Sequence, residues 1–302
     1  MTLYMRPANI LLWSCRSAVP GVIVASGGLD LSSEYARNAR LKPAFLVALP
    51  VAALAATWGL SASVLLGVVS GPLAAAGLTY LLAHLSRDFG VRKQETLFRN
   101  WGGKPSVAKL RHRDTTLNCV TRARYHQKAA ELLGRSMPTA AEEEADPVAA
   151  DLLYEAYSNL LLERTRDTKT YRLLFDELIS YGFRRNLYGM KPLGATLSAF
   201  AVTLQTVSLV LAFRTGHQVD VTKAVFLGLN LFLLTCWLFM ITPAWVKRSA
   251  NSYAERLLAA SENLQPSARR GDPRHNAKPR AAVVDGRSNA KRGSAAVGGS
   301  ET

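Results

Sequence analysis

Charged residues are almost absent from two stretches of this 302-residue sequence. No Asp, Glu, Lys or Arg occurs between Pro43 and Ser86, and only a short polar break interrupts the stretch from Pro192 to Val246. Each stretch contains two apolar runs of 18 to 24 residues. A helix of about 20 apolar residues crosses about 30 Å of hydrocarbon. The pattern predicts an all-α integral membrane protein with four transmembrane helices in two hairpins, in preference to buried helices of a soluble core.

Ionisable side chains are also missing from the middle of each predicted span, and cysteine is scarce. Ion-coupled carriers usually place ionisable side chains in the middle of their membrane spans. The absence of such side chains here disfavours coupled transport. Cys15, Cys119 and Cys236 lie in three different predicted regions. This spacing predicts no disulfide framework and fits a reducing cytoplasm.

Motifs of catalytic, cofactor or metal sites are lacking as well. No serine or cysteine stands in a nucleophile motif, and the glycines before Lys104 do not have the spacing of a phosphate loop. His112, Cys119 and His126 recur every seven residues, whereas zinc ligands usually form closer pairs. The acids at 142–146 suit a helix N-terminus without any ligand. We therefore expect no catalytic activity, no bound metal ion and no cofactor.

Basic residues are plentiful, giving a net charge of +15, and they flank the spans on one side. Lys and Arg near a span are retained in the cytoplasm, so we predict a multi-pass protein of the inner (plasma) membrane with both termini cytoplasmic. A signal peptide ending near Ala25 is the alternative interpretation of the N-terminus. The predicted divisions are a cytoplasmic segment (1–42), hairpin 1 (43–86), a helical cytoplasmic domain (87–191), hairpin 2 (192–246) and a basic, largely disordered cytoplasmic tail (247–302).

The central segment shows helical signals and no useful strand pattern. Helices are expected over 87–99 and 116–133, the latter ending at Gly134. Thr139 and Glu142 form a capping-box pattern that begins a helix, and Asp146-Pro147 either restarts or continues this helix, which runs to about Thr165. That helix is expected to bury one apolar stripe, and a last helix is expected over 168–181. The stripe consists of Val148, Leu152, Ala156 and Leu160.

Small and neutral polar residues are the notable features within the spans. Gly67 and Gly71 have a spacing that lets another helix approach closely, either within the chain or in a homo-oligomer. Gln205 and Asn230 lie at similar depths in the third and fourth spans. We expect their amides to hydrogen-bond across the second hairpin, and the alternative interpretation is a polar pore lining.

Arginines in and near the central segment form the remaining candidate site. They fit either a pocket for an anionic small molecule, since arginine binds phosphate bidentately, or a surface for anionic lipid headgroups. The aromatic residues at 181, 183 and 188 favour the lipid interface. The basic tail lacks stacking aromatics, so no specific nucleic-acid binding is expected. The candidate residues are Arg111, Arg113, Arg122, Arg124, Arg184 and Arg185.

These features predict a non-catalytic inner-membrane protein whose cytoplasmic domain senses a ligand or partner and acts through the hairpins, as an effector or gated channel. Two alternatives stay open. One is a membrane scaffold that recruits cytoplasmic partners, and the other is a passive pore or small transporter.

Overall fold

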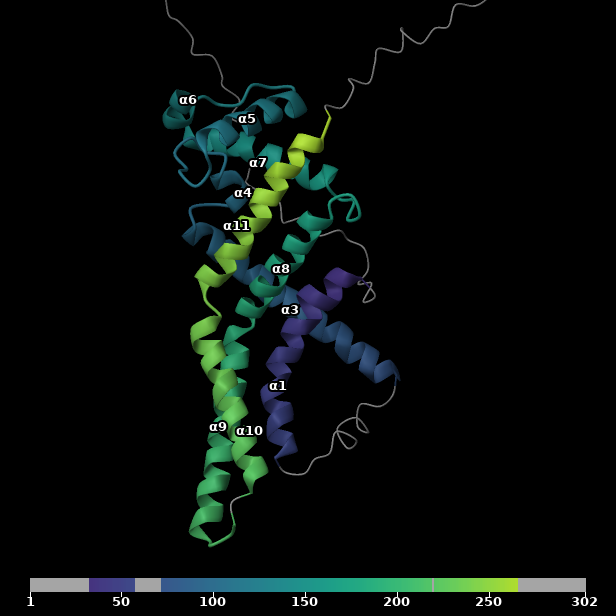
Figure 1. Cartoon of the computed structure of the whole chain (residues 1–302), viewed down its shortest axis with the longest axis vertical. Coiled ribbons are helices and arrows are strands. Elements are labelled where there is room, and N and C mark those ends of the chain that lie inside the picture. Colours follow the sequence, from purple (N-terminus) through teal and green to yellow (C-terminus); the bar gives the residue numbers. More distant parts are fainter. Residues whose placement is uncertain (1–32, 58–71, 219, 266–302) are drawn as a thin grey trace, which may run out of the picture. The chain divides into compact units, whose positions relative to one another are not determined.

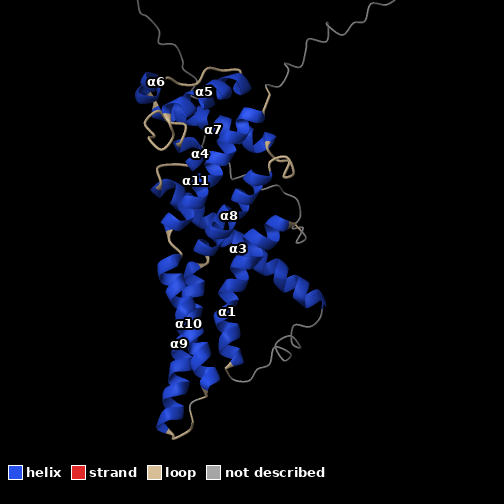
Figure 2. Cartoon of the chain, viewed as in Figure 1, coloured by secondary structure: helices blue, strands red, loops and turns tan. Residues whose placement is uncertain are grey.

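Helices make up all of the regular structure in the described residues (Figure 2). The structure is a computed structural model, and it describes residues 33–57, 72–218 and 220–265. All of the described helices belong to one compact unit that ends at Leu264. The predicted all-α class is therefore confirmed for these residues.

Three helical stretches are long and apolar enough to cross a membrane. The first, Ala36–Ala56, joins the π-helix η1 (Ala36–Leu41) to α1 (Lys42–Ala56). The second is α9 (Lys191–Arg214), and the third joins α10 (Val221–Thr235) to the π-helix η2 (Cys236–Met240). They correspond to the first, third and fourth predicted spans.

The predicted second span is only partly covered by the structure. Residues 58–71, which include Gly67 and Gly71, lie outside the described ranges. Helix α3 (Pro72–Asn100) contains the rest of that span and continues as one helix through the predicted 87–99 segment. Because α3 is not among the three membrane-compatible stretches, a fourth span and the first hairpin remain predictions.

Helix α1 packs chiefly against α9, which runs side by side with α10 in Figure 1. Within the α9–α10 pair, Gln205 and Asn230 are buried, and the Asn230 Nδ2 donates a hydrogen bond of 3.0 Å to the Gln205 Oε1. The two amides therefore face one another, as their depths led us to expect.

The fourth predicted span ends earlier than expected. The chain leaves helical geometry at Ile241, and Thr242 caps a new helix, α11 (Pro243–Ala260), by accepting a hydrogen bond from the Trp245 N–H. Lys191 stabilises the break because its Nζ donates to the carbonyl oxygens of Leu238 and Ile241, at 3.0 and 2.9 Å. The third membrane-compatible stretch thus ends at Met240, six residues before the predicted boundary at Val246.

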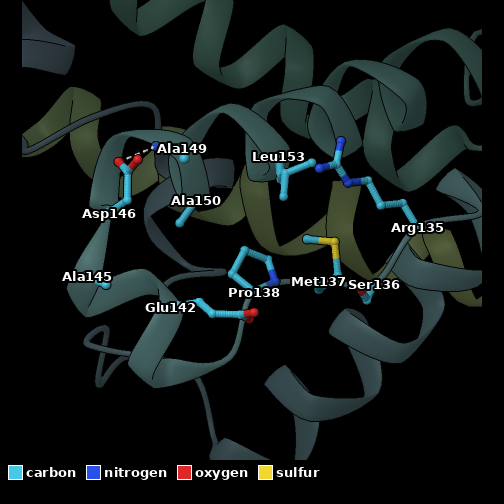
Figure 3. A pocket seen from close by; sticks show the side chains of 10 residues that line it. All are labelled: Arg135, Ser136, Met137, Pro138, Glu142, Ala145, Asp146, Ala149, Ala150 and Leu153. Atoms are coloured by element: carbon cyan, nitrogen blue, oxygen red, sulfur yellow. Dashed lines mark hydrogen bonds between the residues drawn. The ribbon is translucent and has the colours of Figure 1, made fainter. Parts of the chain in front are cut away.

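The described residues of the central segment form five further helices, three of which begin at a side-chain cap. They are α4 (Pro105–Ala108), α5 (Cys119–Leu133), α6 (Ala140–Ala145), α7 (Pro147–Arg164) and α8 (Arg172–Gly189). Gly134 ends α5 at a φ of 66°, and Thr139 and Glu142 form the predicted capping box of α6. Asp146 caps α7 by accepting from the Ala149 N–H at 2.9 Å, a bond drawn in Figure 3.

The buried face of α7 differs from the predicted stripe. Val148 and Leu152 are 71% and 64% exposed, whereas Tyr154 and Tyr157 are fully buried. The buried face is the one that packs against core residues of α5, α8 and α11, which include Leu132, Leu174 and Leu257. The buried face comprises Ala150, Tyr154, Tyr157, Ser158 and Leu161.

Helix α11 extends the folded domain beyond its predicted boundary at residue 191. Leu257, Leu258 and Ala260 join the core formed by α5, α7 and α8, and α11 also packs along α8. The predicted tail therefore begins with the folded helix α11, and residues 266–302 lie outside the described ranges, so the disorder predicted for them stays a prediction. As a result, α9 and α10 are inserted between two helices, α8 and α11, that pack against each other.

Candidate functional site

The α3–α8 crossing is unusually close because glycines meet there. A Cβ atom on Gly189 would lie 2.5 Å from the backbone carbonyl carbon of Phe89, and one on Gly90 would lie 2.8 Å from the Asn186 Cα. Such distances are available only where both helices lack a side chain at the contact. The crossing brings the polar side chains of Arg87 and Gln94 next to Arg185.

Arg185 is the most buried of these charged groups, with 5% of the residue exposed. Its Nη1 donates to the Gln94 Oε1 at 2.6 Å, and its Nε and Nη2 donate to the Asn186 Oδ1 at 3.2 and 3.0 Å. Asn186 is held in turn by its Nδ2, which donates to the Ala39 carbonyl of η1 at 2.7 Å. The guanidinium thus has neutral partners, and no described carboxylate forms an ion pair with it.

Three further cations surround the same cavity, which has a volume of about 90 Å³. Arg40 comes from η1, Arg87 from α3, and Lys104 from the residue that precedes α4. We call the cavity lined by Arg40, Arg87, Lys104 and Arg185 the basic pocket. None of the described residues that line it is acidic. Positive charge is therefore concentrated there without a carboxylate in the wall.

Burial affects the side chains of the basic pocket directly. Burial lowers the pKa of Lys104, and the negative charge of Glu155 only partly opposes this. The Lys104 Nζ donates to the Asn159 Oδ1 at 3.2 Å. The Arg87 Nε is buried and has no hydrogen-bond partner among the described residues. These cations are thus incompletely compensated within the described part of the chain.

Tyrosine side chains form the aromatic part of the wall. Tyr181 and Tyr253 stack with ring centroids 6.2 Å apart and an 8° interplanar angle. The Tyr181 hydroxyl is buried without a described hydrogen-bond partner. Burial raises the pKa of Tyr181 to about 12, although the charge of Arg185 opposes the shift. Tyr181 therefore stays protonated at neutral pH and keeps an O–H donor for a bound group.

Tyr35 also lines the basic pocket and is positioned from two sides. Gly182 leaves room for it, since a Cβ there would lie 2.7 Å from the Tyr35 hydroxyl oxygen. The neighbouring Glu34 accepts two hydrogen bonds from Arg172, at 2.7 and 2.8 Å. The Arg40 guanidinium carbon lies 5.3 Å from the centre of the Tyr35 ring, a distance at which cation and ring attract.

A wider cavity of about 390 Å³ adjoins the basic pocket. Its apolar wall consists of Leu162, Leu174, Phe175 and Leu178, and we call it the apolar cleft. The two cavities share five lining residues, so they adjoin one another. The shared residues are Tyr35, Arg40, Leu162, Leu178 and Tyr253.

Four of the arginines predicted to bind a ligand are engaged elsewhere by the chain. Arg111 forms a bidentate ion pair with Asp151, at 2.8 and 2.7 Å. Arg124 pairs with Glu262 at 3.0 Å, and Arg122 donates to the Asp114 carbonyl oxygen. Arg113 lies 3.9 Å from Glu143. None of the four lines the basic pocket.

The two remaining predicted arginines are adjacent on α8, but their side chains lie in different environments. Arg185 enters the basic pocket. Arg184 instead lies against α11, where its guanidinium carbon is 4.9 Å from the centre of the Trp245 ring and its Nη1 donates to the Trp245 carbonyl. The structure therefore separates the predicted set and brings only Arg185 together with other unpaired cations.

The histidines of the seven-residue pattern do approach each other, but in the core of the domain. The rings of His112 and His126 have centroids 4.8 Å apart, and each Nε2 lies within hydrogen-bond distance of a backbone carbonyl oxygen. Cys119 is exposed at the start of α5. No group of three or more potential metal ligands was found in the described ranges.

Glu143 belongs to this histidine region and is buried. It accepts hydrogen bonds from the His112 backbone N–H and the Tyr154 hydroxyl, at 2.7 and 2.8 Å. Burial raises the pKa of Glu143, but these hydrogen bonds outweigh the effect and hold it below its usual value. Because Glu143 is satisfied within the fold, we assign it a structural role.

Another pocket lies beside the starts of α6 and α7 (Figure 3). Its carboxylates, Glu142 and Asp146, are the caps of these two helices. Both carboxylates already accept hydrogen bonds from backbone N–H groups. This pocket therefore has fewer polar groups available to a ligand than the basic pocket.

Arg40, Arg87 and Lys104 were not selected from the sequence as ligand residues. One sequence signal for the first two is their position within a few residues of the ends of apolar runs, and another is the pair of glycines, Gly90 and Gly189, near a basic residue on each helix. Comparison with other proteins adds no further assignment. No protein-family model matches the chain, and no curated protein or solved structure matches it either.

Proposed function

We propose that this chain is a non-catalytic membrane effector that binds a phosphate-bearing anion in the basic pocket. The observation that carries the proposal is the convergence of four cations from four elements on a cavity without an acidic lining residue. A buried charge without a counter-charge is unfavourable, so an anion in the pocket would stabilise the folded protein. Phosphate suits the site because arginine donates to it in bidentate fashion.

The connections of the pocket residues support an effector role. Arg40 lies in η1, which continues directly into α1, and Arg185 lies in α8, which leads through Met190 into α9. An anion that draws these cations together would therefore act on the ends of two membrane-compatible helices. A ligand shifts a conformational equilibrium when it binds one arrangement more tightly than another.

We test ligand binding by calorimetric titration of inorganic phosphate and pyrophosphate into protein held in neutral-lipid nanodiscs. Removing two pocket cations, as in Arg40→Met with Lys104→Met, is expected to weaken binding about 100-fold, at about 1.5 kcal/mol for each lost charge-assisted hydrogen bond.

The matched control is Arg113→Met with Arg124→Met, which also removes two charges but from exposed positions outside the pocket. The control should bind like the unmodified protein. Equal losses in both double variants would show nonspecific attraction to a basic protein, and undetectable binding to the unmodified protein would reject the anion assignment.

The proposal includes the predicted topology of four spans with a cytoplasmic domain and cytoplasmic termini in the inner membrane. The basic residues beside the described spans support this orientation. In intact cells, a Gln218→Cys probe in the α9–α10 connection should react with an impermeant maleimide. The native Cys119, kept as the sole cysteine in a second variant, should react only after permeabilisation. The reverse labelling would overturn the orientation.

A further inference from the structure

The cavities of the domain have opposite chemical character. The basic pocket is small and cationic, whereas the adjoining apolar cleft is about four times larger and has leucine and phenylalanine side chains in its wall. Ligand sites of several hundred Å³ commonly combine an apolar lining with a few polar groups that fix orientation. The apolar cleft supplies the apolar lining and the adjoining basic pocket supplies the polar groups.

We infer that the ligand is an amphiphile, with one phosphate group in the basic pocket and an alkyl or acyl chain in the apolar cleft. This inference rests on the proposed function, because the phosphate end uses the same four cations. The shared residues Tyr35, Leu162 and Leu178 lie where the headgroup would join the chain.

Several polar side chains in the wall of the apolar cleft are already engaged within the chain, which favours a hydrocarbon chain over a nucleoside. Asn159 accepts from Lys104, and Glu163 accepts from Arg166 at 2.7 Å. The Thr165 hydroxyl donates to the Leu161 carbonyl oxygen at 2.8 Å. A base or sugar would need free donors and acceptors to replace its hydrogen bonds with water, whereas a hydrocarbon chain needs none.

The position of the basic pocket along the sequence agrees with an amphiphile. Arg40 comes three residues before Pro43, and Arg87 directly follows Ser86, the two residues that bound the first charge-free stretch. Basic residues at such positions lie near the lipid headgroups. The same amphiphile could therefore arrive from solution or from the adjacent lipid layer.

The chain-length dependence of binding tests the apolar cleft separately from the basic pocket. Ethyl, butyl, hexyl and octyl phosphate are titrated into protein in neutral-lipid nanodiscs, with empty nanodiscs as the partition blank. Each methylene that enters the apolar cleft should tighten binding about fourfold.

The variant Phe175→Gln removes an apolar wall residue and should reduce this gain to less than twofold per methylene, with the affinity for inorganic phosphate unchanged. The matched control is Leu173→Gln, two positions away along the same helix and 65% exposed. It should keep the full gain.

The outcomes separate the two proposals. Phosphate binding that is independent of chain length would overturn the amphiphile and leave the anion site standing. A chain-length gain that survives Phe175→Gln would overturn the assignment to the apolar cleft. Failure of every phosphate to bind would overturn both proposals.

A second arm distinguishes the source of the ligand. Monoacyl glycerol phosphate is incorporated in the nanodisc lipid, and octyl phosphate is then titrated from solution. Loss of octyl phosphate binding by competition would identify delivery from the bilayer, while unchanged binding would identify the soluble form. Competition should disappear in the Arg40→Met, Lys104→Met variant, and its persistence there would contradict binding in the basic pocket.

Discussion

Replacing Gly189 by alanine is expected to destabilise the protein by about 3 kcal/mol, near the upper end of the effects of overpacking. The added Cβ would lie 2.5 Å from both the carbonyl carbon and the oxygen of Phe89, and 2.6 Å from the Gly90 nitrogen. These are backbone atoms, so no side-chain rotation can relieve the contact. Helices α3 and α8 would have to separate.

That separation should also damage the anion site, because Arg87 and Gln94 would move away from Arg185. Stability is measured by thermal unfolding in nanodiscs, and phosphate affinity is measured on the folded fraction at low temperature. We expect affinity to fall at least tenfold in Gly189→Ala even where the protein remains folded. An unaltered affinity would show that the α3–α8 spacing does not control the site.

The matched control for this substitution is Gly228→Ala in α10. A Cβ at Gly228 meets no atom within 4 Å, and alanine favours a helix over glycine by about 0.5–1 kcal/mol. Gly228→Ala should therefore leave the protein equally or slightly more stable. A similar loss of stability in both variants would contradict the contact-based explanation.

Local signals in the sequence predicted several helix ends because the atoms that decide them are neighbours in the chain. The helix expected over 168–181, which has no such side-chain cap, is instead Arg172–Gly189. Gly134 adopts the left-handed conformation that ends α5, and Thr139 and Glu142 exchange the two hydrogen bonds of a capping box. Asp146-Pro147 starts α7 as a new helix, which is one of the two alternatives that the sequence allowed. In each case, the required partners lie within a few residues, so the sequence alone specifies the result.

The choice of buried face was less predictable because it depends on distant helices. The aliphatic stripe that includes Val148 and Leu152 has helical spacing, yet both residues are exposed. The facing core is formed partly by Leu257 and Leu258, about 100 residues later in the sequence. Periodicity identifies a face of a helix but does not identify the partner that covers it.

The candidate site was hidden in the sequence for the same reason. Arginine spacing within the central segment indicated the group at 111–124, but Arg111 and Arg124 form ion pairs with carboxylates that lie far away in the sequence. Arg40, Arg87 and Lys104 are spread over three elements and meet Arg185 only after α3 and α8 cross. Sequence analysis found the basic character and one of the four residues.

The environment of Arg185 predicts that this residue contributes little to the free energy of unfolding and much to the affinity for phosphate. Its hydrogen bonds to Gln94 and Asn186 stabilise the fold, but its charge has no described carboxylate partner. Removing a buried charge that lacks a counter-charge can offset the loss of its hydrogen bonds. In Arg185→Met, the free energy of unfolding without ligand should therefore change by less than about 1 kcal/mol.

Ligand binding should respond much more strongly to the same substitution. Arg185→Met removes the most buried cation of the basic pocket and is expected to weaken phosphate binding at least 30-fold, equivalent to about 2 kcal/mol for a hydrogen bond to a charged group. Arg185→Lys should weaken binding less, by about tenfold, since the charge remains while the bidentate geometry is lost. Calorimetry gives both affinities, and thermal unfolding with and without phosphate gives the coupled stabilisation.

Arg184→Met is the control because it removes a charge from the adjacent position without touching the basic pocket. Its guanidinium lies over Trp245, so the variant should lose some stability at the α8–α11 contact and retain phosphate affinity. If Arg184→Met and Arg185→Met weaken phosphate binding equally, the net charge of α8 determines the affinity and the basic pocket is not the binding site. If only Arg185→Met loses both binding and ligand-dependent stabilisation, the buried cation is retained for an anion and not for the fold.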